Sequence, residues 1–120
     1  MSQSTDLTNH IMALIEQDTG LLGELSSKWF YFGVPQTFPS IYLDGLYLVD
    51  DKLDTWNFNI SFATNDMSLE GLETAKQVRN ALQASNCIHA QSILVRPEPE
   101  NKRTRYLIPC SAFLYALSTN

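Results

Sequence analysis

The sequence predicts a single α+β domain: an antiparallel β-sheet flanked by two helices, in the order α-β-β-β-α-β-β. Two segments repeat apolar residues at helical spacing, and five others have the alternating or aromatic character of strands. No linker, internal repeat or low-complexity tract interrupts the 120 residues, a common length for one domain. We therefore expect residues 1–120 to form one domain with residues 1–5 flexible, and a mixed sheet is the alternative to a purely antiparallel one.

The two helices are predicted from their apolar faces and caps. The first spans Leu7–Gln17 with Asp6 as its N-cap, and the second spans Leu69–Ala84 with Asp66 or Ser68 as its cap. A further helical turn at Leu21–Leu25 is compatible with the leucines there. The apolar faces consist of Leu7, Ile11, Leu14 and Ile15 in the first helix and of Leu69, Leu72, Ala75, Val78 and Leu82 in the second.

Three strands are expected between the helices. The aromatic run Trp29–Gly33 suits a short strand, and the two prolines that follow predict an extended loop. Alternation predicts the next strand from Ser40, with Ile41, Leu43 and Tyr47 on one face. An acidic hairpin turn then leads to the clearest alternation in the chain, in which Trp56, Phe58, Ile60 and Phe62 face the core and Asn57, Asn59 and Ser61 do not.

Two closing strands follow the second helix, at about Ile88–Arg96 and Thr104–Leu117. Because Pro109 cannot donate a backbone hydrogen bond, the last strand is expected to be bulged or to lie at a sheet edge there. The predicted core consists of Leu7, Ile11, Leu14, Trp56, Phe58, Ile60, Phe62, Leu72, Val78, Leu82, Ile108 and Leu114.

No residue pattern in the chain indicates catalysis or a bound cofactor. Cys87 and Cys110 lack a CxxC spacing and lie in apolar surroundings, so we expect buried, reduced thiols. His10 and His89 have no partner at a metal-ligand spacing and are read as surface or boundary residues. We therefore expect no enzyme activity, no metal and no cofactor; a small α+β enzyme would need a pocket with perturbed titratable groups.

The charge balance is acidic, with eight Lys and Arg against thirteen Asp and Glu and a net charge of −5. An acidic surface does not favour nucleic acid or anionic membranes. The start of the chain has no signal peptide and no stretch is long enough to span a membrane, so we expect synthesis in a reducing cytoplasm.

Three surface segments are candidates for contacts with other proteins. The acidic tip contains Asp50, Asp51 and Asp54, for which a solvated turn and a divalent-cation site are alternatives. The basic hairpin contains Lys102, Arg103 and Arg105, for which a solvated turn and a nucleic-acid contact are alternatives. Four consecutive aromatic residues cannot all face the core from one strand, so part of this run is also a candidate: Trp29, Phe30, Tyr31 and Phe32.

The layout from Leu7 to Leu117 resembles the tail terminator, or tail completion, proteins of long-tailed bacteriophages, including minor tail proteins of lambda-like phages. The opening helix ends in Glu16-Gln17-Asp18 and is followed by the aromatic segment Trp29–Gly33. A proline-bounded loop then leads into a strand through a Phe-Pro-x-Ile step, here Phe38-Pro39-Ser40-Ile41. A long alternating strand, a second amphipathic helix and a closing strand pair complete the resemblance.

This resemblance implies a structural role. Such proteins form a ring, usually hexameric, that caps the tail tube, stops its polymerisation and meets the head connector. The expected partners are copies of the chain itself, the tail tube protein and the head–tail connector protein, with DNA only passing through the ring lumen. The expected location is the virion tail, assembled in the host cytoplasm. No interface residue is carried over from the family, so the candidates above come from the loops of this chain.

A different class of function is also open. A small acidic phage or bacterial inhibitor that binds a basic, nucleic-acid-binding partner would have the same composition, and its binding would depend strongly on salt. The two interpretations differ in oligomeric state, because a closed ring has several times the mass of the chain. In a ring, the acidic tip of one subunit would face the basic hairpin of the next.

Overall fold

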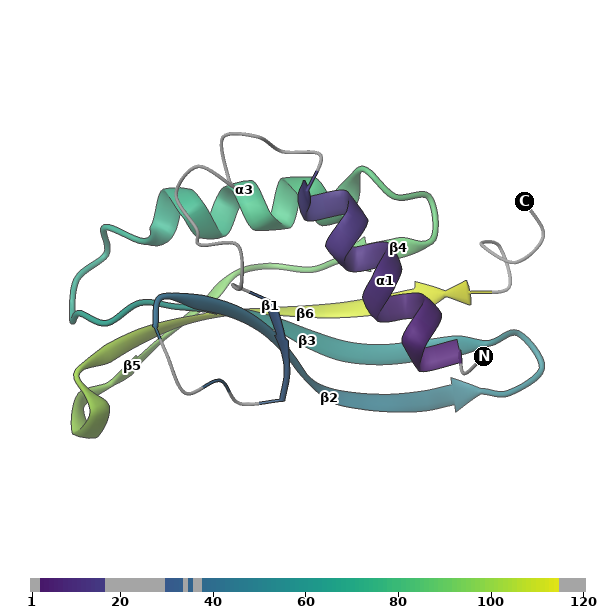
Figure 1. Ribbon diagram of the computed structural model, residues 1–120, viewed down its shortest axis with the longest axis horizontal. Helices are drawn as coiled ribbons and strands as arrows, with labels where there is room; N and C mark the ends of the chain where they lie inside the picture. Colours follow the sequence, from purple (N-terminus) through teal and green to yellow (C-terminus); the bar gives the residue numbers. More distant parts are fainter. Residues whose placement is uncertain (1–2, 17–29, 34, 36–37, 115–120) are drawn as a thin grey trace.

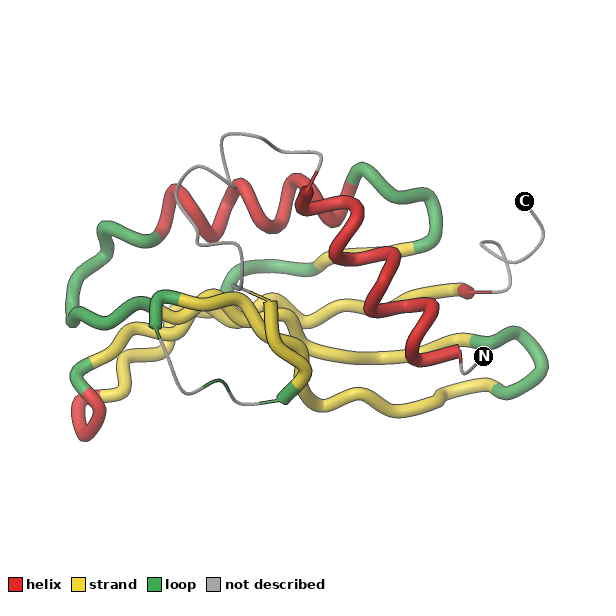
Figure 2. The backbone as a smooth tube through the Cα atoms, in the orientation of Figure 1, coloured by secondary structure: helices red, strands yellow, loops and turns green. Residues whose placement is uncertain are grey.

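The protein folds as a helical layer over one β-sheet. The computed structural model describes residues 3–16, 30–33, 35 and 38–114. Helices α1 (Gln3–Glu16) and α3 (Leu72–Gln83) both lie on one face of the sheet, as Figures 1 and 2 show. The molecule is elongated, with extents of 42 × 28 × 24 Å along its principal axes.

The sheet has six strands in the described part of the chain. They are β1 (Phe30–Phe32), β2 (Ser40–Asp50), β3 (Thr55–Ala63), β4 (Ile88–Ala90), β5 (Leu94–Glu98) and β6 (Arg103–Phe113). Their order is β1-β2-β3-β6-β4, and β5 pairs with the same edge of β6 as β4 does. Only the short β1 runs parallel to its neighbour. The predicted α+β class with two helices is confirmed, and the parallel pair makes the sheet mixed.

One predicted strand, Ile88–Arg96, is in fact two. It is interrupted at residues 91–93, where the Gln91 amide donates to the Pro109 carbonyl at 2.9 Å. In a strand, the backbone nitrogen and carbonyl of one residue point to the same side. The Pro109 nitrogen, which has no hydrogen to donate, therefore points toward residues 91–93 as its carbonyl does. Pro109 therefore lies in a central strand, but at a position where the ladder toward β4 and β5 is broken.

A bulge in β2 corrects a second expectation. The pairing with β3 shifts between Asp44 and Tyr47, at Gly45, whose φ is +63°. The extra residue turns Tyr47 to the face opposite Leu43, where it meets Asn57 on the side of the sheet that carries no helix. Tyr47 therefore does not share a face with Ile41 and Leu43, because a one-residue slip exchanges the faces of every following side chain.

Both helices begin elsewhere than predicted. Helix α1 starts at Gln3, so Asp6 lies inside it. Helix α3 starts at Leu72 after Gly71, with no side-chain cap. The Asp66 carboxylate instead accepts hydrogen bonds from the amide and hydroxyl of Ser68, and the Ser68 hydroxyl accepts one from the Glu70 amide. These polar side chains are used in the turn before the helix, which leaves Leu69 exposed.

The hydrophobic core lies between the helices and the sheet, as predicted. Ten of the twelve predicted core residues are buried, and Trp56 and Leu72 pack against the core partly exposed. Other core residues include Ile41, Leu43, Tyr106 and Ile88.

Cys87 and Cys110 are buried free thiols, as expected, and burial raises the pKa of Cys110 to about 12. The expected helical turn at Leu21–Leu25 lies outside the described residues, as does the end of the last predicted strand beyond residue 114. No described helix is long and apolar enough to cross a membrane.

A partly buried polar cluster joins α1 to the turn after α3. The half-buried His10 places Nε2 2.8 Å from Ser85 Oγ and 3.4 Å from Cys87 Sγ, and the Ser85 hydroxyl also accepts from the Cys87 amide. Burial lowers the pKa of His10 below its ordinary value of 6.5. The folded chain therefore favours the neutral imidazole in this cluster.

This cluster predicts that the protein loses stability in mild acid. Because the pKa of His10 is lower in the folded chain, the unfolded chain binds the proton first as pH falls below 6.5. The stability that depends on neutral His10 is fully present above pH 6.5. It is lost as the pH falls from 6.5 to the lower pKa that His10 has in the folded chain. His10→Gln, which keeps a hydrogen-bonding group, should flatten the pH dependence of urea midpoints between pH 7 and 5, whereas His89→Gln on the exposed part of β4 should not. Equal pH profiles for wild type and His10→Gln would contradict this assignment.

Candidate functional site

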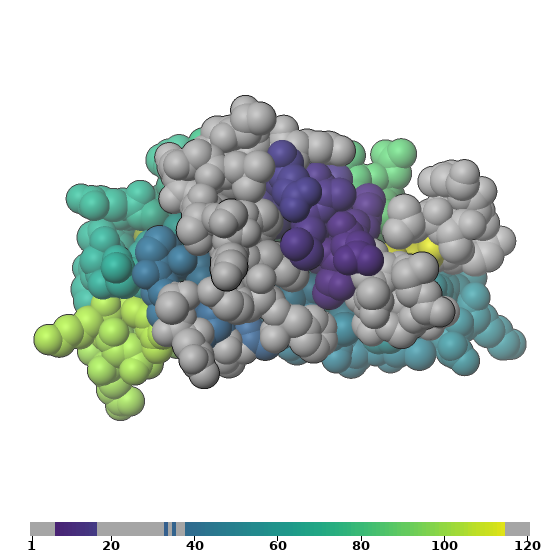
Figure 3. Space-filling model, viewed as in Figure 1, coloured from purple at the N-terminus to yellow at the C-terminus, as the bar shows by residue number. Residues whose placement is uncertain are grey.

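The two charged hairpins lie at opposite ends of the molecule. The β2–β3 turn forms one end of the longest axis, and the β5–β6 turn, which contains the 3-10 helix η1 (Pro99–Asn101), forms the other (Figure 1). Both turns project in the space-filling view (Figure 3). A head-to-tail contact between copies joins two different surfaces, and these two turns are different surfaces of one copy.

At the acidic end, the three aspartates have different roles. The Asp50 carboxylate accepts hydrogen bonds from the Lys52 and Leu53 amides at 2.9 and 3.3 Å, and so closes the turn. The Asp54 carboxylate accepts one from Trp56 Nε1 at 2.7 Å, and the Asp54 backbone has a φ of +51°. Asp51 is exposed at the tip, so it is the aspartate of this turn that is available to a partner.

Exposed apolar side chains surround the acidic tip. Leu53 is 54% exposed within the turn itself, and the neighbouring ends of β2 and β6 add further large side chains: Tyr47, Leu48, Val49 and Phe113. A monomer rarely exposes so many large apolar residues in one place without a binding role. The acidic end therefore offers both charge and apolar area.

At the basic end, two of the three predicted cations are held by the chain itself. Arg105 donates to Asp44 at 3.1 Å and to Ser61 Oγ at 3.0 Å on the helix-free face of the sheet. The Arg103 guanidinium lies 4.0 Å from the centre of the Phe38 ring and 3.7 Å from Glu98. These two arginines stabilise the sheet and the loop before β2, whereas Lys102 is exposed in the turn.

The aromatic candidates stay a prediction. Phe30, Tyr31 and Phe32 form β1 beside β2, and Trp29 lies outside the described residues. Their side chains also lie outside the part that the structure describes.

Further cations and apolar side chains extend the basic end along the molecule. Arg96 is exposed on β5, and Lys76 and Arg79 lie on α3. Four large side chains near Tyr106 are exposed: Met67, Leu69, Leu94 and Val95. Lys76 and Arg79 lie beside the interrupted segment at residues 91–93, so their surroundings depend on the break in the edge strand.

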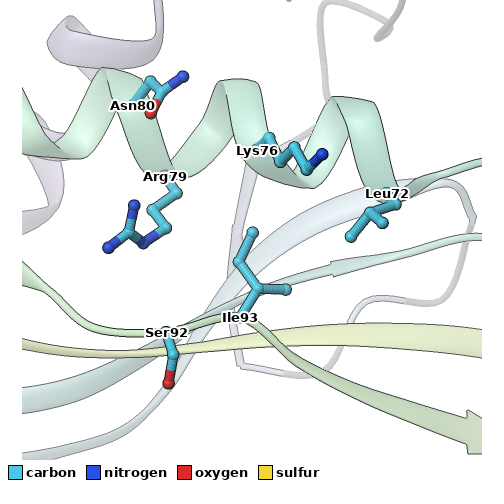
Figure 4. Close-up of a pocket in the computed structure, with 6 residues that line it drawn as sticks. All are labelled: Leu72, Lys76, Arg79, Asn80, Ser92 and Ile93. Carbon is cyan, nitrogen blue, oxygen red and sulfur yellow. The ribbon is translucent and has the colours of Figure 1, made fainter.

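A hollow of about 480 Å³ lies between α3 and this break (Figure 4). Leu72 and Ile93 supply apolar walls, and Lys76 and Arg79 supply positive charge. The Arg79 Nε donates to the Gln91 carbonyl, which ties the interrupted segment to the helix. Within the described residues, no group of three or more His, Cys, Asp or Glu side chains could hold a metal ion.

Comparison with known proteins gives a likeness of fold. No family model matches the chain, and no curated protein matches it. Among solved structures, the fold is similar to that of a chain from the virion of a native gene transfer agent particle, with a TM-score of 0.58 and 16% sequence identity. The likeness covers 85% of this chain and 89% of that chain, so the fold is shared over most of both chains.

Proposed function

We propose that this protein is a structural component of a virion that acts as a tail terminator: a ring of copies that caps the tail tube, stops its polymerisation and meets the head connector. The single observation that carries the proposal is the pair of projecting turns at opposite ends of the molecule, one with the exposed carboxylate of Asp51 and one with the exposed Lys102, each near exposed apolar side chains. The fold likeness to a chain of the gene transfer agent virion and the resemblance of the sequence layout to tail terminators support the same role.

The arrangement suits repeated assembly better than inhibition of a basic partner. An inhibitor that mimics phosphates needs free carboxylates, but Asp50 and Asp54 are engaged in the turn. A ring needs one surface that fits a different surface on the next copy. Charge would set the register and rate of this contact, and the apolar side chains at both ends would supply the buried area. The proposed partners are copies of the chain, the tube protein and the connector protein.

The proposal predicts that charge reversal at either end weakens assembly. Lys102→Glu or Asp51→Lys should raise the concentration needed for half-assembly several-fold, more at low salt, because exposed charge pairs contribute about 0.2–1 kcal/mol each. Mass photometry of concentrated protein, with negative-stain images to show closed rings, measures this.

The choice of positions follows from the contacts. Arg103→Glu or Arg105→Glu would also break contacts with Phe38 or Asp44 inside the chain, so Lys102 reports on assembly more cleanly. Glu16→Lys, on the exposed last residue of α1 between the two ends, is the control for net charge. A protein that stays monomeric with and without these changes, and binds a basic partner in a salt-dependent way, would instead support the inhibitor.

A further inference from the structure

The hollow between α3 and the interrupted edge strand combines features of a binding site for a short acidic, apolar turn. Its walls from Leu72 and Ile93 are apolar, and Lys76 and Arg79 lie on the same helix side (Figure 4). The Arg79 guanidinium has five N–H donors, of which Nε is used by the Gln91 carbonyl. The remaining donors have no protein acceptor within the described residues. Lys76 has one partner there, Glu73, in an exposed ion pair at 3.2 Å.

The shape of the hollow has a local cause. Pro109 offers no donor to the passing strand, so the chain leaves β6 between β4 and β5 and resumes pairing at Leu94. A concave surface is left between the interrupted segment, at Ser92 and Ile93, and helix α3. A convex turn such as that containing Lys102 cannot enclose another turn, but this hollow can.

The acidic tip has the complementary chemistry. Asp51 is exposed, and Leu53 is 54% exposed two residues later in the same projecting turn. A carboxylate and a leucine at this spacing match a site with cations on one wall and apolar carbon on the other. This turn combines a projecting position with an exposed carboxylate, an exposed large apolar side chain and net negative charge.

We infer that the hollow receives the β2–β3 tip of a second copy of this chain, with Leu53 against Leu72 and Ile93, and Asp51 facing Lys76 and Arg79. This inference rests on the proposed function and names the receiving surface of its head-to-tail contact. Helix α3 lies between the two ends of the long axis (Figure 1), so the tip meets the flank of the next copy. Copies joined end to flank turn relative to one another, which allows closure into a ring.

Cysteine cross-linking tests the inference. The chain carrying both Lys52→Cys and Ser92→Cys, which keeps Asp51, should form a ladder of disulfide-linked oligomers under mild oxidation. The comparison chain carries Lys52→Cys and Asn101→Cys, which places the second thiol in the β5–β6 turn instead. All three positions are exposed, and the native thiols are buried. Each single-cysteine chain gives at most dimers and serves as the background.

The outcomes separate the two proposals. Faster cross-linking through Ser92→Cys supports the hollow as the receiving surface. Cross-linking that is faster or equally fast through Asn101→Cys overturns the inference but keeps a head-to-tail contact between copies. No ladder from either chain overturns the inference and the head-to-tail contact together.

Charge reversal in the cross-linking chain gives a second measurement. Lys76→Glu should slow ladder formation through Ser92→Cys several-fold, and more at low salt. Lys102→Glu changes the net charge equally and should slow it less, because that lysine lies outside the hollow. Equal slowing by both variants would mean that only the overall charge of the basic side matters, which would also overturn the inference.

Discussion

Replacing Phe62 by alanine is expected to lower the free energy of unfolding by about 3–5 kcal/mol, a large part of the stability of a small domain. The ring is 4% exposed in the core and stacks with Tyr106 at a centroid distance of 6.1 Å and an interplanar angle of 24°. Its removal would leave a cavity under helix α3 that backbone atoms of the sheet cannot fill. The same loss is expected for Phe58→Ala, because Phe58 is equally enclosed. Urea midpoints measure both.

Asn57 and Asn59 on the opposite face of β3 provide the controls. Asn57→Ala removes one exposed hydrogen bond to the Tyr47 hydroxyl, at 2.8 Å, and should cost about 1 kcal/mol or less. Asn59→Ala should also cost far less than either phenylalanine. Losses as large on this face as on the core face would mean that the strand is covered on both sides, for instance by another subunit.

The core could be predicted from local patterns because it depends on periodicities of 2 and 3.6 residues. Phe58, Ile60 and Phe62 alternate without interruption, and the helical faces of α1 and α3 are clear. The face of the sheet on which Tyr47 lies could not be predicted. The bulge at Gly45 moves the residues after it to the other face, and the alternation before it gives no sign of this. The same limit applies to the caps: Asp66 and Ser68 are suitable residues, but they form a turn before the helix.

The candidate site was predicted in part. The hairpins were located correctly, and their placement at opposite ends of the molecule follows from the strand order. The partners of Arg103 and Arg105 could not be predicted, because Asp44 and Phe38 are about sixty residues away along the chain and meet these arginines only after folding. Lys76 is exposed on α3, opposite the apolar face of the helix, but the contact of Arg79 with Gln91 could not be predicted because it depends on the interruption of the edge strand at residues 91–93.

Replacing Gly71 by alanine is the other change expected to have a large effect. A Cβ at this position would lie 2.7 Å from Thr64 Cγ2, 2.9 Å from Tyr106 Cε2 and 3.2 Å from Phe62 Cε2. The backbone of Gly71 has φ −77° and ψ −5°, which alanine adopts readily, so the cost is steric. Both rings are buried and stacked and cannot turn aside without opening the core. We expect a loss of about 1–3 kcal/mol in the free energy of unfolding.

Thr64→Ser provides a matched rescue. This change removes the methyl group that the new Cβ would strike first, and it keeps the hydroxyl that donates toward Asp66 and the Thr104 carbonyl. Gly71→Ala combined with Thr64→Ser should therefore lose less stability than the sum of the two single changes, which a double-mutant cycle of urea midpoints measures. Strictly additive losses would show that the Thr64 methyl group is not the obstacle to the added Cβ. Gly45→Ala offers a contrast, because there the φ of +63° causes strain and the near atom, Asn59 Nδ2, belongs to a side chain that can move. Its loss should not depend on Thr64, since the two positions share no neighbouring atom among those closest to either added Cβ.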